Sequence, residues 1–163
     1  MKRQLLYKIL FILILPIHLF AQPNPSAERD ITGLWKGSLY NDTTKKYLPY
    51  EIAISEERGK LSGYSYTLFD IDGKKEIGVK SIKIKRKGDQ LIIEDVELIS
   101  NNYSEPPPRK VRQLSVVNLL VNDTAMILTG NWSTNRTKEY NPLTGSLQVQ
   151  RSLDYKPPFI LLF

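Results

Sequence analysis

The chain has 163 residues, of which 41% are hydrophobic and 25% are charged, and it carries a formal net charge of +6. This length suits a single domain, and the composition excludes a disordered polyelectrolyte and a polytopic membrane protein. The absence of Cys also excludes disulfides, thiolate nucleophiles, Cys-ligated zinc and iron–sulfur clusters.

Residues 1–21 have the pattern of a secretory signal peptide. Three basic residues open the segment, the apolar run Ile9–Leu15 follows, and Ala21 offers a small residue for cleavage. An uncleaved N-terminal anchor is the alternative. Cleavage near Ala21 predicts an exported protein, either periplasmic or secreted.

Removal of this segment changes the chemistry that remains. It carries three basic residues and no acidic ones, so the formal charge falls to +3, which is too mild to predict a nucleic-acid partner. The only histidine, His18, leaves with it. A mature chain without His or Cys has no Ser-His-Asp triad, no Cys-His pair and no His-ligated metal. We therefore expect a protein that is not an enzyme and that uses no metal or cofactor.

After a polar leader at 22–30, apolar residues recur with the period of two that is typical of strands. The turn Lys87–Gln90 joins the clearest hairpin, and its register sets Lys83 opposite Glu94 and Ile84 opposite Ile93. In chain order the expected strands are Leu34–Tyr40, Tyr47–Ser55, Lys60–Phe69, Ile77–Arg86, Leu91–Ile99, Val111–Val121, Thr124–Trp132 and Leu143–Arg151.

These patterns predict an all-β domain over residues 31–151, followed by a C-terminal tail over 152–163 that ends in FILLF. Eight sequential strands on short connections favour an eight-stranded antiparallel up-and-down barrel, because closure removes the exposed sheet edges. A two-sheet β-sandwich fits the same pattern and remains the alternative.

The first strand carries Gly33-Leu34-Trp35, a G-x-W motif that resembles the lipocalin-type signature of the calycin barrels. The surrounding DITGLWKGSL is also similar to the opening of avidin-like barrels. The lipocalin resemblance implies that Trp35 fills the closed end of a barrel and that an Arg near the last strand lies against its ring. Arg151 matches that Arg in position, and it shares a face with Leu147 and Val149 at period two.

Aromatic residues on two strand faces suggest a ligand pocket. Tyr64 and Tyr66 share one face, and Met126 shares another with Trp132. If both faces point inward, they line a pocket with apolar walls and a few hydroxyls. The loop after Trp132 adds candidates that orient a polar group of the ligand, Arg136 and Tyr140. The alternative is that these side chains simply fill the core, since an eight-stranded barrel is just wide enough for either outcome.

Three charged patterns have ordinary structural explanations. The segment Asp70–Gly73 begins like a calcium loop but lacks the later ligands, so a hairpin turn explains it better. A set of basic residues on one hairpin predicts a solvated strand face that pairs with the acidic residues of the next strand. These basic residues are Lys80, Lys83, Lys85, Arg86 and Lys87. Asp95 and Glu97 are expected to share a face about 7 Å apart, the spacing of paired glycosidase carboxylates, on an exposed hairpin that argues against that chemistry.

The sequence predicts an exported, lipocalin-like barrel that binds a small apolar or amphipathic ligand without catalysis. The alternative is a structural or protein-interaction module of the cell envelope with a filled core. In that case the outer face or the C-terminal tail docks an envelope partner.

Overall fold

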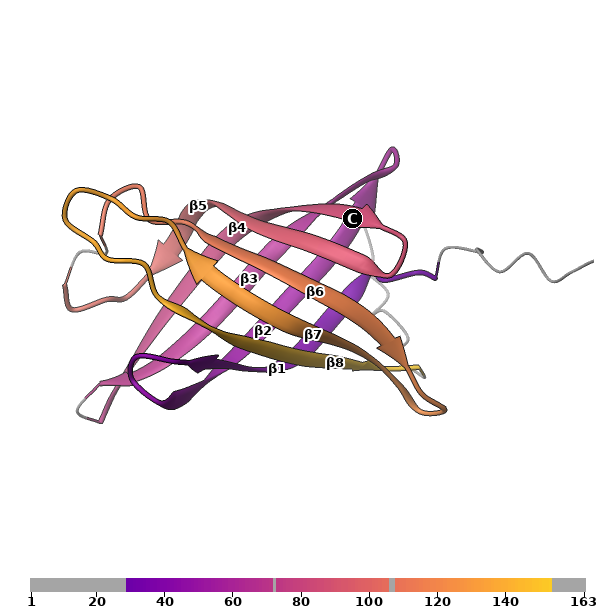
Figure 1. Ribbon diagram of the computed structural model, residues 1–163, viewed down its shortest axis with the longest axis horizontal. Helices are drawn as coiled ribbons and strands as arrows, with labels where there is room; N and C mark the ends of the chain where they lie inside the picture. Colours follow the sequence, from indigo (N-terminus) through magenta and orange to yellow (C-terminus); the bar gives the residue numbers. More distant parts are fainter. Residues whose placement is uncertain (1–28, 72, 106–107, 154–163) are drawn as a thin grey trace, which may run out of the picture.

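Eight strands close into one antiparallel barrel (Figure 1). The computed structural model describes residues 29–71, 73–105 and 108–153. Each strand pairs with the next one in sequence, and β8 pairs with β1, so the predicted up-and-down barrel is confirmed and the sandwich is excluded. The strands are β1 (Gly33–Asn41), β2 (Lys46–Glu57), β3 (Lys60–Ile71), β4 (Lys74–Lys87), β5 (Gln90–Asn101), β6 (Gln113–Val121), β7 (Ala125–Thr134) and β8 (Thr144–Ser152).

The hairpin of β4 and β5 has the predicted register. Lys83 lies opposite Glu94 and Ile84 lies opposite Ile93. The Lys83 Nζ atom is 2.9 Å from Glu94 Oε2 on the outer face, while both isoleucines point into the core. Gly88 supports the tight turn with a φ of 61°, a left-handed value that glycine adopts without steric cost.

The barrel has two unlike ends (Figure 1). At the N-terminal end, on the right of the figure, the chain enters at residues 29–32. The β2–β3, β4–β5 and β6–β7 connections at this end are short turns. At the loop end, on the left, lie the β1–β2, β3–β4, β5–β6 and β7–β8 connections. The predicted signal peptide and most of the polar leader and C-terminal tail lie outside the described residues. Within the described residues, no helix has the length and hydropathy needed to cross a membrane.

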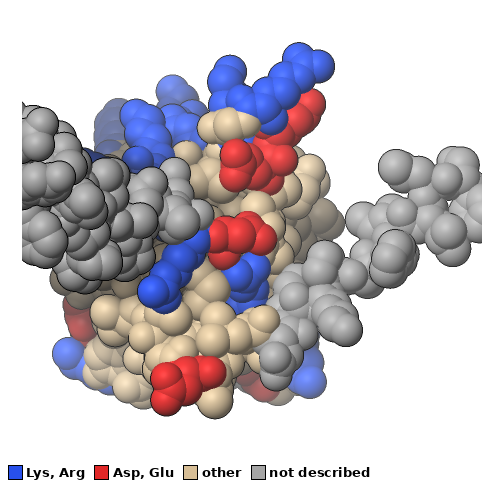
Figure 2. Space-filling model, turned by 90° about the vertical axis from the view of Figure 1, so that its right-hand side faces the viewer, with Lys and Arg blue, Asp and Glu red and all other residues tan. Residues whose placement is uncertain are grey.

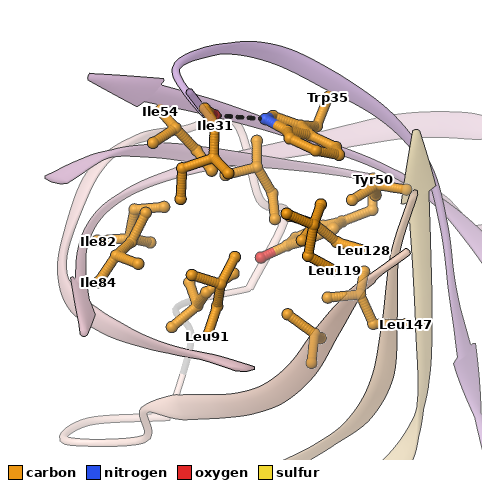
Figure 3. Close-up of a cluster of buried hydrophobic side chains, with 14 of the residues drawn as sticks. Ile31, Trp35, Tyr50, Ile54, Ile82, Ile84, Leu91, Leu119, Leu128 and Leu147 are labelled. Atoms are coloured by element: carbon orange, nitrogen blue, oxygen red, sulfur yellow. Dashed lines mark hydrogen bonds between the residues drawn. The ribbon is translucent and has the colours of Figure 1, made fainter. Parts of the chain in front are cut away.

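Buried apolar side chains from all the strands except β3 fill the barrel (Figure 3), and Leu61 of β3 packs against them. Several of them have 0% exposure, namely Trp35, Ile52, Leu91, Val117 and Leu128. A side chain with no accessible surface touches neither bulk solvent nor a cavity large enough for a water molecule. The layers that these residues occupy are therefore packed as a solid core.

β5 changes its phase halfway along its length. Register shifts interrupt its pairing with β4 between Val79 and Lys80 and between Ser81 and Ile82. Such bulges turn successive side chains away from simple alternation. As a result Asp95 is buried inside the barrel while Glu97 is exposed. The prediction that these two carboxylates share a face is wrong.

The barrel closes where Gly145 of β8 passes β1. A Cβ atom at Gly145 would lie 1.8 Å from the Tyr40 carbonyl oxygen and 2.7 Å from Trp132 Nε1. The first atom is backbone of the facing strand and the second belongs to a buried indole, so a side chain at this position would push both away.

We therefore expect Gly145→Ala to lower the free energy of unfolding by about 1–3 kcal/mol or more through overpacking. Urea unfolding measures the change. The control is Ser146→Ala, because Ser146 is exposed on the outer face, and its effect should stay within about 0.5 kcal/mol. Equal effects of the two substitutions would show that the seam tolerates a side chain at Gly145.

Candidate functional site

Trp35 and Arg151 close the N-terminal end. The Trp35 indole N–H donates a hydrogen bond of 2.9 Å to the Ile31 carbonyl oxygen (Figure 3). The Arg151 guanidinium carbon lies 5.4 Å from the centroid of the Trp35 ring, within the range of a cation–π contact. Gly33 has a φ of 112°, which lets the chain turn from this plug into β1. The pairing that the lipocalin resemblance implies is present.

Two arginines fasten the entering chain across this end. Arg151 donates hydrogen bonds to the carbonyl oxygens of Thr32 and Asp30, the second at 2.6 Å. Arg86 donates to the Arg29 carbonyl oxygen at 2.6 Å. The visible surface of this end mixes acidic and basic side chains (Figure 2). Arg86, expected as part of a solvated basic face, is thus half-buried and structural.

The two predicted wall residues of β7 lie inside the barrel and support its closure. Met126 is 3% exposed, and its sulfur accepts a hydrogen bond of 3.1 Å from Arg151. Trp132 is 5% exposed. Its indole N–H is shared between the carbonyl oxygens of Tyr40 and Ser146, each at 3.1 Å. Both side chains therefore connect strands.

Tyr64 and Tyr66 lie on the outer face of β3, and the prediction that they point inward is wrong. Tyr64 is 55% exposed, and Tyr66 shares its face and is half-buried. The inward positions next to these tyrosines belong to small buried residues, Gly63 and Ser65. At Gly63 a Cβ atom would lie 1.8 Å from the Ala53 carbonyl oxygen. The period of two showed which residues of β3 share a face, but it did not show which of the two faces turns into the barrel.

Arg136 and Tyr140 lie in the loop between β7 and β8. Arg136 is exposed and Tyr140 is half-buried. The loop is held by a backbone hydrogen bond of 3.1 Å from the Thr137 N–H to the Tyr140 carbonyl oxygen. The six predicted ligand residues are therefore divided among the interior, the outer face and the rim of the loop end.

Sequence reasoning missed a polar cluster in the interior. Tyr50 is 2% exposed, and its hydroxyl points inward (Figure 3). Burial raises the pKa of Tyr50 well above its usual value and the charge of Asp95 adds to the effect, whereas a hydrogen bond with Ser65 opposes it. Asp95 in turn accepts hydrogen bonds from Lys80 Nζ at 2.6 Å and from the Gln113 N–H at 3.3 Å.

This cluster is suited to a structural role, in which its hydrogen bonds stabilise the fold. The phenol of Tyr50 stays protonated because its pKa is raised. The Asp95 carboxyl group is held by hydrogen bonds from Lys80 and Gln113. The sequence signal for this cluster was the small or polar character of three inward positions on different strands, Ser65, Asp95 and Ser115. The described part of the chain has no group of three or more acidic, His or Cys residues that could hold a metal ion.

Two depressions on the outer surface of the described residues could not be predicted from the sequence. One, of about 730 Å³, lies beside the start of β6 and is bordered by Glu94, Arg112 and Asn135. The other, of about 450 Å³, follows the seam between β1 and β8 and also touches Tyr47 of β2. We call the second one the β1–β8 groove. Its walls are formed by Ser38, Tyr40, Tyr47, Ser146, Gln148 and Gln150.

Glu76 fastens the β5–β6 loop at the loop end. The Ser104 backbone N–H donates to Glu76 Oε1 at 2.8 Å, and Lys74 Nζ lies 3.9 Å from the same oxygen. The Ser104 hydroxyl and this N–H lower the pKa of Glu76, and the charge of Lys74 contributes further, while burial acts in the opposite direction.

The lowered pKa of Glu76 predicts a contribution to acid stability. A carboxyl group whose pKa is lower in the folded state stabilises the fold above its unfolded pKa of about 4.3, and this contribution is lost as pH falls through the folded pKa. We expect Glu76→Gln to flatten the fall of Tm between about pH 5 and pH 3. Glu57→Gln, at the exposed end of β2, should leave the profile unchanged. Parallel profiles for both variants would contradict this role.

The contact between Trp35 and Arg151 can be measured directly. Trp35→Ala should lower the free energy of unfolding by about 3–5 kcal/mol through the cavity it leaves, and Arg151→Ala should cost less. Because the two side chains touch, the double variant should cost less than the sum of the single losses in urea unfolding. Strict additivity would show that the contact contributes nothing.

Comparison of the chain with protein-family models, with curated proteins and with solved structures found no significant match in any of the three.

Proposed function

We propose that the protein is an exported, non-catalytic binding module that acts through its outer surface. The single observation that carries this proposal is the packed interior, in which side chains with 0% exposure leave no room for an apolar ligand in their layers. The signal-peptide pattern of residues 1–21 supports export to the periplasm or the outside of the cell. The absence of His and Cys after that segment supports a role without catalysis.

A lipocalin-like ancestry is part of the proposal. It is supported by the closed eight-stranded barrel, the G-x-W motif at Gly33–Trp35, and the contact of Arg151 with the Trp35 ring. Shared architecture does not carry over a shared ligand, because function depends on the site that each barrel presents. We therefore expect the partner of this chain to bind on the outer surface of the barrel.

A small amphipathic ligand inside the barrel is the second candidate, restricted to the loop end. The observation that favours it is the 30% exposure of the Lys80 side chain, whose partner Asp95 is buried in the interior. Solvent therefore reaches the Lys80 side of the polar cluster. A ligand there would meet charged and hydroxyl groups in addition to apolar ones.

Native mass spectrometry of the processed chain from the envelope fraction of its own host tests the proposal. We expect to measure the mass of the protein alone, without a bound ligand. We also expect that added benzene shows no saturable binding to the protein. The control is Leu128→Ala, which opens a cavity in the same core and should bind benzene if it folds. An extra mass of a few hundred daltons that leaves on denaturation would overturn the filled-interior proposal and favour the second candidate.

A further inference from the structure

Resting on the proposed surface function, we propose that the β1–β8 groove binds a neutral glycan chain. The groove follows the outer face of the barrel seam, where three cross-strand pairs point outward in succession. These pairs are Lys36 with Gln150, Ser38 with Gln148, and Tyr40 with Ser146. From Lys36 to Tyr40 the row is about 13 Å long at about 3.3 Å per residue. A volume of about 450 Å³ is in the usual range of ligand sites.

Two tyrosines form one end of the groove. The rings of Tyr40 and Tyr47 have centroids 4.9 Å apart at an angle of 48°. Tyr47 is 72% exposed, so most of its ring is available to a partner. A pyranose ring presents a face of C–H groups that packs on an aromatic face, and its hydroxyls meet the polar tip of a tyrosine. The pair is thus suited to hold one sugar ring.

The rest of the wall consists of uncharged polar side chains. Gln148 and Gln150 each carry a donor and an acceptor, and the hydroxyls of Ser38 and Ser146 do both. Among the described residues, none of these four side chains takes part in a hydrogen bond. Sugar hydroxyls also donate and accept at once, so a row of such groups matches a row of hydroxyls.

The charge of the groove selects against other polymers. Its one charged lining residue, Lys36, lies 3.1 Å from Glu51, so the groove offers no free field of positive charge to a nucleic acid or an anionic polymer. Extended peptides bind proteins by adding a strand to an open sheet edge. Both edges of β1 and of β8 are paired within the barrel, so this mode is closed here.

The groove is held in place from the inside of the wall. The Trp132 indole N–H bonds the carbonyl oxygens of Tyr40 and Ser146, which belong to the two sides of the groove. On the floor, Gly37 lacks the side chain whose Cβ would lie 2.1 Å from the Gln148 carbonyl oxygen. Fixed walls lower the conformational entropy that the protein itself loses when a glycan chain binds.

Isothermal titration of the processed chain with cellohexaose, maltohexaose and chitohexaose tests the proposal, with the anionic hexagalacturonate as a fourth probe. We expect at least one neutral hexasaccharide to bind. Tyr47→Ala should then weaken its affinity by about threefold to tenfold through loss of the ring contact, and Gln148→Ala should weaken it as well. The matched control is Tyr64→Ala, another exposed tyrosine on a different strand, which should leave the affinity unchanged.

Three results would overturn the glycan proposal. These are no binding of any neutral probe, binding of hexagalacturonate alone, or equal losses from Tyr47→Ala and Tyr64→Ala. Capture of a protein partner that depends on Tyr47, with no neutral probe bound, would reject the glycan and leave the surface function standing. A ligand retained inside the barrel in the native mass spectrum would instead reject the surface function itself.

Discussion

The closure of β8 on β1 is the constraint on which the rest of the structure depends. Two glycines make this approach possible, since a Cβ atom at Gly37 or at Gly145 would strike the backbone of the facing strand. The buried indole of Trp132 then bonds both strands at once. One tryptophan and two glycines thus support the pairing of β1 with β8, which turns an open meander with two free edges into a closed barrel.

Closure at this diameter leaves an interior that the chain fills with its own side chains. Apolar residues pack the middle and the N-terminal end, where Arg151 covers Trp35. Toward the loop end the interior becomes polar, with Tyr50 and Ser65 beside the ion pair of Lys80 and Asp95. Each buried polar group there has a partner, as a low-dielectric interior requires. The same packing supports a function located on the outer wall.

The N-terminal plug and the β1–β8 groove depend on the same two strands. Trp35 lies on the inner face of β1 and Arg151 on the inner face of β8, while Lys36 and Gln150 occupy the outer face beside them. Because alternate residues of a strand face opposite sides, one pairing register sets both the plug inside and the groove outside. A slip of one residue would exchange the two faces and destroy both.

The sequence alone determined the number of strands, their order and the register of the β4–β5 hairpin, because period two and turn residues are local signals. It also pointed to Trp35 and Arg151 through their resemblance to a known motif. The tertiary structure decided what is not local. Tyr64 and Tyr66 face outward because small inward residues share β3 with them, and a bulge separates Asp95 from Glu97. The groove exists only because closure brings β1 beside β8, from opposite ends of the domain.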